Sequence, residues 1–276
     1  FDISGLELFL PLICGAQCVI ASQETVVDGI KLKETLEKKR ISILQATPMT
    51  WKMLLASGWK GSSLQKMLCG GEALSIDLAR ALLDKCAHLW NLYGPTETTV
   101  WSVIARITSD EKDELKTIPI GKPLQNTQVY VLNAHQRPVP IGIVGELYIG
   151  GAGVARGYLN QPELTQQKFI SNFFDPSQSA YLYRTGDFVR WNESGNLEFM
   201  GRVDEQVKLQ GYRIELGEIE RCLMQHNWLK EAVVLISNDG SEQLVVYFTI
   251  NGADTPCNNH VIIQLRDFLK QLLPSY

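Results

Sequence analysis

The sequence has little that would mark a zinc protein, a nucleic-acid-binding protein or a membrane protein. It contains no Cys-x-x-Cys pair and no histidine and cysteine cluster at zinc spacing, so its six cysteines are expected to be reduced thiols of a cytoplasmic protein. It has no basic tract and a net charge of -4, which gives no reason to expect nucleic acid as a partner. The longest apolar run, 9–21, is broken by proline, glycine and glutamine and is too short to span a bilayer, so no membrane partner is expected.

What is present is the composition of an ordinary globular protein. Hydrophobic residues make up 45% and charged residues 20% of the 276 residues, which is enough for one large domain or two moderate ones. The chain begins without methionine at Phe1, inside an apolar segment, and ends at Tyr276 directly after an amphipathic helical pattern. We therefore expect it to be a fragment of a longer protein.

The stretch 91–101, Asn-Leu-Tyr-Gly-Pro-Thr-Glu-Thr-Thr-Val-Trp, gathers residues that suit a ligand site. It follows an apolar run, 86–90, that is predicted to be a buried strand, and Gly94-Pro95 predicts a turn. Threonine hydroxyls can donate to phosphate oxygens, the Glu97 carboxylate can hold Mg²⁺, and Tyr93 offers a flat face to a base. From these residue types alone, a solvated turn whose threonine caps the next helix is the simpler interpretation.

Residues 30–92 alternate between strand and helix patterns. Strands are predicted over 41–46, 66–69 and 86–90, and helices are predicted to start at Thr47-Pro48 and at Ser75. This β-α-β-α-β order implies a parallel sheet with right-handed crossovers. Two loops, 70–73 and the one at Tyr93, then lie at the carboxyl ends of strands, where open α/β sheets bind ligands.

The pattern changes after residue 117. Short strand-like runs separated by turn residues predict a small β-barrel or a distorted sheet, over 129–132, 145–149, 181–184 and 196–199. The segment 151–157, Gly-Ala-Gly-Val-Ala-Arg-Gly, is similar to a dinucleotide fingerprint, but its last glycine is one residue late and no βαβ unit follows. We therefore reject that interpretation.

A smaller module is predicted after Asp204. The segment 206–215 has the pattern of a hairpin with a glycine turn, and 216–223 fits a helix. Strands are predicted over 232–236 and 244–250, and a helix over 261–273. These elements predict an α+β lid.

The string 93–99, Tyr-Gly-Pro-Thr-Glu-Thr-Thr, resembles the nucleotide-binding core motif of the adenylate-forming enzymes, and most closely that of nonribosomal peptide synthetase adenylation domains. Segments resembling other motifs of this family follow its order along the whole chain: 1–4, 145–165, 183–187, 201–204 and 273–276. The resemblance implies an α/β fold with a parallel doubly wound sheet portion and a small β-barrel subdomain, followed by an α+β C-terminal lid domain. The expected domain boundaries are 1–115, 116–203 and 204–276.

Two family elements are expected outside the sequence. The glycine-rich phosphate loop of the family is expected before Phe1, and its catalytic lysine is expected after Tyr276. The fragment alone is therefore expected to be inactive, whereas the longer protein is expected to be an AMP-forming ligase.

The resemblance implies ATP and Mg²⁺ as ligands. Glu97 would hold Mg²⁺, and Tyr93 would stack on adenine. Asp187 would accept hydrogen bonds from both ribose hydroxyls, which suits an acceptor-only carboxylate. The hinge would be Asp204. The implied catalytic residues are Thr96, Glu97, Arg202 and Lys208. The implied nucleotide-binding residues are Gly71, Glu72, Ala73, Asn91, Tyr93, Gly94, Thr96, Asp187, Phe199 and Arg202.

The resemblance also implies an amino acid pocket. Its members are Asp2, Ile3, Leu6, Gln45, Leu68, Gly70, Leu92, Val100 and Trp101. Asp2 would pair with the substrate ammonium, although an acid at this place is usually only a helix N-cap. Asp2 is the single charge in the set and leaves no partner for an ionic side chain, while Trp101 and the aliphatic side chains fill volume, so a small neutral substrate is expected. The set resembles that of glycine-activating domains, which makes glycine the expected substrate and alanine the second. If Trp101 only fills the core, substrate size does not follow.

The implied activity has two steps. An amino acid and ATP form aminoacyl-AMP, and the aminoacyl group is then loaded onto the phosphopantetheine of a peptidyl carrier protein domain. A condensation domain of the same synthetase is the further expected partner. Two alternatives stay open: an acyl- or aryl-CoA synthetase of the same superfamily, and a non-catalytic nucleotide-binding module.

Overall fold

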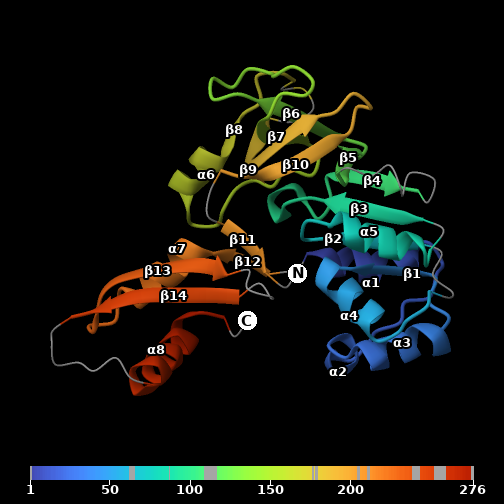
Figure 1. The fold of residues 1–276 in the computed structure, drawn as a ribbon. Helices are drawn as coiled ribbons and strands as arrows, with labels where there is room; N and C mark the ends of the chain where they lie inside the picture. The colour runs from blue at the N-terminus through green and yellow to red at the C-terminus, as the bar shows by residue number, and fades with distance from the viewer. Residues whose placement is uncertain are drawn as a thin grey trace. The chain divides into compact units, whose positions relative to one another are not determined.

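The computed structural model divides into two compact units, unit 1 (Phe1–Val203) and unit 2 (Asp204–Tyr276) (Figure 1). The residues that it describes are 2–61, 66–86, 88–108, 117–175, 177, 180–203, 206–209, 212–237, 243–251 and 259–274. The division into three domains made from the sequence remains a prediction.

Unit 1 begins with alternating helices and strands. In chain order these are α1 (Ile3–Ile13), α2 (Gln23–Val26), α3 (Gly29–Lys38), β1 (Ile43–Ala46), α4 (Pro48–Ala56), β2 (Lys66–Gly70), α5 (Ile76–Leu83) and β3 (Leu89–Tyr93). The hydroxyl of Thr47 accepts from the Thr50 N–H, and that of Ser75 accepts from the Leu78 N–H. Both predicted helix starts are therefore confirmed, since these caps satisfy backbone donors that have no partner within the helix.

Strands β1, β2 and β3 are parallel, as the sequence predicted. The predicted bounds of the third strand, 86–90, are wrong, because β3 begins at Leu89 and includes Tyr93. Pairing decides its position: Leu89 lies opposite Met67 of β2 and Ile107 of the antiparallel β4 (Val103–Ile107). These three side chains are buried together in the core.

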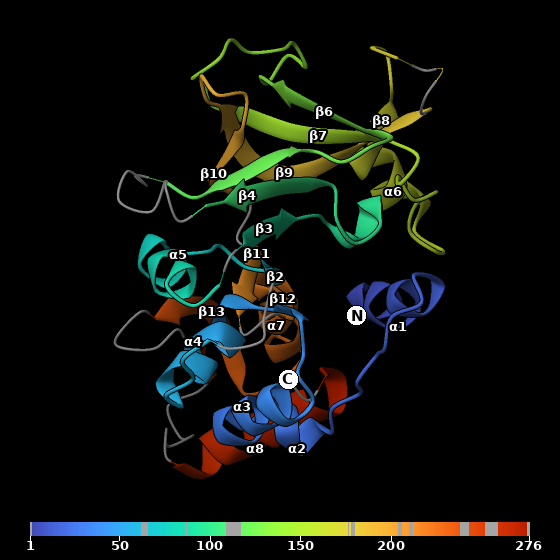
Figure 2. The same ribbon diagram turned by 90° about the vertical axis from the view of Figure 1, so that its right-hand side faces the viewer.

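The remaining strands of unit 1 continue the same sheet. They are β5 (Pro119–Pro123), β6 (Thr127–Leu132), β7 (Gly145–Gly151), β8 (Phe169–Ser171), β9 (Tyr181–Trp191) and β10 (Leu197–Arg202), with α6 (Pro162–Lys168) before β8. The hydrogen-bonded order is β1-β2-β3-β4-β5-β10-β9-β7-β6, with β8 paired to β9 (Figure 2). Of the two predicted alternatives, the described strands form the distorted sheet, with register shifts where β9 meets β7 and β10.

Strand β9 is longer than predicted. It runs from Tyr181 to Trp191, whereas the sequence pattern indicated only 181–184. The Thr185-Gly-Asp187 segment therefore lies within a strand. The strand is irregular at this point, because Gly186 has φ +77° and the register with β7 shifts between Glu146 and Tyr148, whereas Asp187 pairs with Arg202 of β10.

Among the described residues, two larger hydrophobic cores and a smaller one, around Leu182, stabilise unit 1. In the first, α3, α4 and α5 pack on the parallel strands around Trp51, Leu54 and Leu82. The second lies within the β-rich part and includes Tyr93, Val103 and Ile120. Tyr93 is the last residue of β3 and also belongs to the second core, so packing in that core fixes the carboxyl end of this strand.

Unit 2 contains β11 (Gln206–Leu209), β12 (Tyr212–Glu215), α7 (Leu216–Leu223), β13 (Leu229–Ser237), β14 (Gln243–Ile250) and α8 (Asn259–Leu272). Strands β11 and β12 form the predicted antiparallel hairpin, and β13 and β14 form a second antiparallel pair. A core that includes Leu223, Val234 and Leu265 joins α7, β13 and α8. The predicted α+β order of this module is confirmed.

Five cysteines in the described ranges are free thiols: Cys14, Cys18, Cys69, Cys86 and Cys222. Burial, with a smaller contribution from the charge of Glu72, raises the pKa of the Cys69 thiol to about 12. Among the helices of the described residues, none is both long and apolar enough to cross a membrane. The cytoplasmic location expected from the sequence stays a prediction.

Gly121 lies in β5, between β4 and β10 in the sheet, and the structure requires glycine there. Its φ is +101°, and a Cβ placed on it would lie 1.9 Å from the carbonyl oxygen of Ile104. Gly121→Ala is expected to lower the free energy of unfolding by about 3 kcal/mol or more, because the cost of a positive φ for alanine adds to the cost of the overlap with the Ile104 backbone. Gly142→Ala is the matched control, with φ +83° and nothing within 4 Å, and about 1 kcal/mol is expected. Urea unfolding measures both, and equal losses would contradict the assigned overlap.

Candidate functional site

The candidate site lies at the carboxyl ends of β1, β2 and β3, where the loops after these parallel strands meet. The loop after β2 contains Gly71, Glu72 and Ala73, and Gly71 has φ +89°. The loop after β3 forms a short 3-10 helix, η1 (Thr96–Thr98). This is the edge at which open α/β sheets bind ligands.

Trp101, Gln45 and Gly70 are brought together at this edge. The Trp101 indole Nε1 donates to Gln45 Oε1 at 2.9 Å. A Cβ on Gly70 would lie 2.5 Å from Trp101 Cη2 and 2.9 Å from the Leu92 carbonyl oxygen. The indole therefore occupies the space that a side chain at position 70 would need. Leu68 lies beside Gln45 in the strand register.

An unusual backbone places Trp101 over the end of β3. Thr99 and Val100 both have positive φ, +64° and +67°, and the Ser102 N–H donates to the Tyr93 carbonyl at 2.9 Å. A Cβ on Gly94 would lie 2.3 Å from the Val100 carbonyl oxygen, so glycine is needed for the chain to fold back. Left-handed conformations of ordinary residues cost about 1–3 kcal/mol each and gather at functional sites.

Helix α1 carries the first three residues of the predicted pocket. The Asp2 carboxylate caps this helix, with Oδ1 accepting from the Ile3 N–H at 2.9 Å. Leu6 is one turn further along. The next residue, Glu7, accepts through Oε1 from Gln45 Nε2 at 2.9 Å and so connects α1 with β1. Partial burial raises the pKa of the Glu7 carboxyl, and the hydrogen bond from Gln45 opposes that shift.

Asp187 is the centre of a second group of predicted residues. It lies in β9 with 4% of its surface exposed. The Tyr93 hydroxyl donates to Asp187 Oδ2, and Arg202 of β10 forms an ion pair with Oδ1 at 2.5 Å. Burial, and then the charge of Asp187, raises the pKa of Tyr93 well above its usual value, so the phenol keeps its proton and acts as a donor.

Glu97 lies on η1 with 7% of its surface exposed. Its Oε1 accepts from the Tyr158 hydroxyl at 2.6 Å, and the Ala155 N–H donates to its backbone carbonyl at 2.8 Å. Sequence reasoning missed Tyr158, although it lies in the segment 145–165 that resembles a family motif. Tyr158 holds the Glu97 carboxylate in one orientation. Thr96, the residue before Glu97, is exposed.

A magnesium site can be tested against these residues. No group of three or more histidine, cysteine, aspartate or glutamate side chains suited to a metal ion occurs in the described part of the chain. Mg²⁺ in nucleotide sites is usually bound by one or two carboxylates, with substrate phosphates and water completing the shell. The single carboxylate of Glu97 fits that donor set, and no dedicated protein cage is needed.

The other predicted site residues are more dispersed. Asn91 is buried, and its Nδ2 donates to the Pro119 carbonyl at 2.9 Å, so this amide holds β5 against β3. Phe199 lies on β10, and Lys208 lies on β11 in unit 2. The predicted hinge, Asp204, lies outside the described residues.

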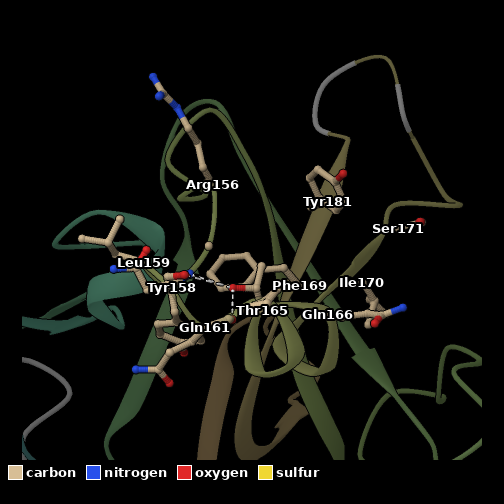
Figure 3. Close-up of a pocket in the computed structure, with 13 residues that line it drawn as sticks. Arg156, Tyr158, Leu159, Gln161, Thr165, Gln166, Phe169, Ile170, Ser171 and Tyr181 are labelled. Atoms are coloured by element: carbon tan, nitrogen blue, oxygen red, sulfur yellow. Dashed lines mark hydrogen bonds between the residues drawn. The ribbon is translucent and has the colours of Figure 1, made fainter.

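A separate cavity of about 1000 Å³ lies beside α6 and β8 and is lined by Tyr158, Thr165, Phe169 and Tyr181, among others (Figure 3). The Tyr158 N–H donates to Thr165 Oγ1 at 2.9 Å, and the Thr165 hydroxyl donates to the Gln161 carbonyl at 2.8 Å. Tyr158, the partner of Glu97, is the one site residue in its lining, and none of the residues predicted from the sequence lines it, so we assign this cavity no catalytic role.

Comparisons with known proteins agree with the motif order. Residues 1–159 match the model of the AMP-binding enzyme family. The whole chain is 44% identical to a segment of a dimodular nonribosomal peptide synthase of Bacillus subtilis (strain 168), covering 11% of it, and 39% identical to tyrocidine synthase 1 of Brevibacillus parabrevis, covering 24%. The chain therefore spans only a small part of these relatives.

Solved structures show the same likeness. One is a crystal structure of a four-domain nonribosomal peptide synthetase in its holo form, bound to AMP and glycine; it is 50% identical with a TM-score of 0.69, covering 92% of this chain and 19% of that one. Another contains adenylation and PCP domains and is 29% identical with a TM-score of 0.81, covering 96% of this chain and 53% of that one.

The Tyr93 hydroxyl is expected to contribute to stability through Asp187. Tyr93→Phe should lower the free energy of unfolding by about 1–3 kcal/mol, because a buried carboxylate loses a donor that the core cannot replace. Tyr247→Phe, at an exposed position of β14, is the control and should change it by less than about 0.5 kcal/mol. Denaturant unfolding measures both. No difference between the two variants would show that the contact adds nothing to stability.

Proposed function

The chain belongs to the AMP-binding enzyme family, and on that premise we propose that it is part of an adenylation domain that activates glycine for nonribosomal peptide synthesis. The observation that carries the proposal is the packing of Trp101 against Gly70, beside Gln45 at the end of the parallel strands. The likeness to a synthetase structure bound to AMP and glycine supports it.

In the proposed first step, a carboxylate oxygen of the amino acid attacks the α-phosphorus of ATP. A new bond between oxygen and phosphorus forms, the bond to the β-phosphate oxygen breaks, and pyrophosphate leaves with the electron pair. The exposed hydroxyl of Thr96 can donate to a phosphate oxygen. Mg²⁺ held by Glu97 would supply charge neutralisation for the triphosphate. Tyr158 keeps the Glu97 carboxylate oriented.

Asp187 is proposed to hold the ribose. Its carboxylate has about four acceptor positions, and the described bonds from Tyr93 and Arg202 use one on each oxygen. Capacity therefore remains for a vicinal diol. Arg202 also brings a positive charge next to this position, which favours an approaching phosphate. Tyr93 is the proposed contact for adenine, through the 7% of its surface that is exposed.

The pocket is proposed to select its substrate by charge and by size. Asp2 would pair with the substrate ammonium, and the Trp101 indole leaves little room for a side chain. Glycine is therefore the preferred substrate, with alanine second. A phosphopantetheinyl carrier domain would receive the aminoacyl group, with Lys208 in the segment of unit 2 that faces the site in that step and Asp204 as the hinge. A condensation domain of the same synthetase is the further proposed partner.

Asp2→Asn in the full-length protein separates the charge of Asp2 from its capping role. Asparagine caps helices as well as aspartate does, but it cannot neutralise an ammonium group. Glycine-dependent exchange of pyrophosphate into ATP is expected to fall about 10- to 100-fold, because a charge-assisted contact is worth about 1.5–3 kcal/mol. Asp28→Asn, in the cap of α3, is the matched control and should leave exchange unchanged. Exchange driven by fatty or aryl acids, and by no amino acid, would point to a CoA synthetase instead.

Trp101→Ala tests the size limit of the pocket. Exchange with alanine and valine relative to glycine is expected to rise about 10-fold or more, because one methylene in a pocket is worth about 1–3 kcal/mol. Trp90→Ala is the control, since this ring lies on the same sheet under Arg106, outside the predicted pocket. If Trp101→Ala ranks glycine, alanine and valine as the unaltered protein does, Trp101 does not limit substrate size.

A further inference from the structure

We propose that Glu7, which lies outside the predicted pocket, is a positioning residue for amino acid selection. By accepting a hydrogen bond from Gln45, it fixes the amide that holds the Trp101 indole against Gly70. The inference rests on the proposed function, because it concerns selection in the same pocket.

The hydrogen-bond chain has one arrangement that satisfies all three side chains. Trp101 Nε1 donates to Gln45 Oε1, and Gln45 Nε2 donates to Glu7 Oε1, each at 2.9 Å. An indole N–H can only donate and a carboxylate can only accept, whereas an amide has one end of each kind. The Glu7 carboxylate therefore favours the amide orientation that turns the Gln45 carbonyl toward the indole.

The opposite orientation would place two donors face to face. The Gln45 amino group would then meet the indole N–H, and its carbonyl oxygen would meet the Glu7 carboxylate. Trp101 would lose its acceptor, and the ring would no longer be held over Gly70, where its Cη2 now fills the position of a side chain. Because a single methylene changes selection about 10- to 200-fold, a small ring displacement is enough to admit alanine.

Glu7 also connects the two sides of the pocket. It follows Leu6 on α1, the helix that carries Asp2 and Ile3, and its partner Gln45 is on β1. The Glu7–Gln45 hydrogen bond joins α1 directly to β1. A partly exposed hydrogen bond adds little to global stability. Its main effect is on the position of α1 and Trp101.

The variant Glu7→Leu in the full-length protein removes the acceptor. The ratio of kcat/KM for alanine to that for glycine, measured by pyrophosphate exchange, is expected to rise about 10-fold, while KM for ATP is unchanged. Glu7→Gln keeps an acceptor oxygen and should keep the original ratio. Glu37→Leu, at an exposed position of α3, is the matched control and should also keep it.

A spectroscopic measurement tests the contact itself. With 5-fluorotryptophan incorporated, the ¹⁹F resonance of Trp101, assigned by its loss in Trp101→Phe, is expected to shift in Glu7→Leu and to stay in place in Glu7→Gln. If Glu7→Leu does not fold, Gln45→Glu replaces it. In Gln45→Glu the carboxylates at positions 7 and 45 face each other and repel, so selection for glycine should relax. Adding Glu7→Gln to this variant should restore selection, because the amide at position 7 can donate to the carboxylate at position 45 and bridge α1 and β1 again.

The outcomes separate this inference from the proposed function. If the unaltered protein shows no amino-acid-dependent exchange, the proposed function is overturned, and the selection role of Glu7 falls with it. If the unaltered protein selects glycine but Glu7→Leu has the same ratio and the same Trp101 resonance, only the inference is overturned. Failure of Glu7→Gln to restore selection in the Gln45→Glu background would overturn it as well.

Discussion

The neutralisation of one buried carboxylate, Asp187, organises the candidate site. Moving a charge out of water costs several kcal/mol unless partners replace the solvent, so β3 and β10 must bring Tyr93 and Arg202 to it. The parallel strands are thereby joined to the β-rich part at the point where the proposed ribose site lies. Tyr93 also packs in the second core, so the same side chain connects hydrophobic packing with the chemistry of the site.

Features that depend on residues close together in the sequence could be predicted, whereas features that depend on the pairing of distant strands could not. The helix starts at Thr47 and Ser75 depend on a hydroxyl and a donor three residues later, so the local pattern was sufficient. The start of β3 at Leu89 depends on β2 and β4 on its two sides. The sequence pattern indicated a strand only over 181–184, but β9 continues to Trp191 because β7 and β10 pair with it on its two sides.

The same distinction applies to the site. Family motifs indicated Glu97, Asp187 and Trp101, because these residue types occur in short strings with a fixed order. Their partners are far away in the sequence: Tyr158 is 61 positions from Glu97, and Gln45 is 56 positions from Trp101. Glu7 belongs to no motif, and only the folded chain shows its contact with Gln45, 38 positions away. Such pairs depend on tertiary structure, about which a single sequence says little.

The hydrogen bonds of Gln45 have a consequence for how the two sides of the proposed pocket respond to a ligand. Gln45 accepts from Trp101 on one side and donates to Glu7 of α1 on the other. A ligand that orders one part of a connected network lowers the entropy cost of ordering the rest. Under the proposed function, an amino acid that engages Asp2 at the start of α1 would therefore also tighten the contact of Trp101 with Gly70, so that affinity and size selection are coupled.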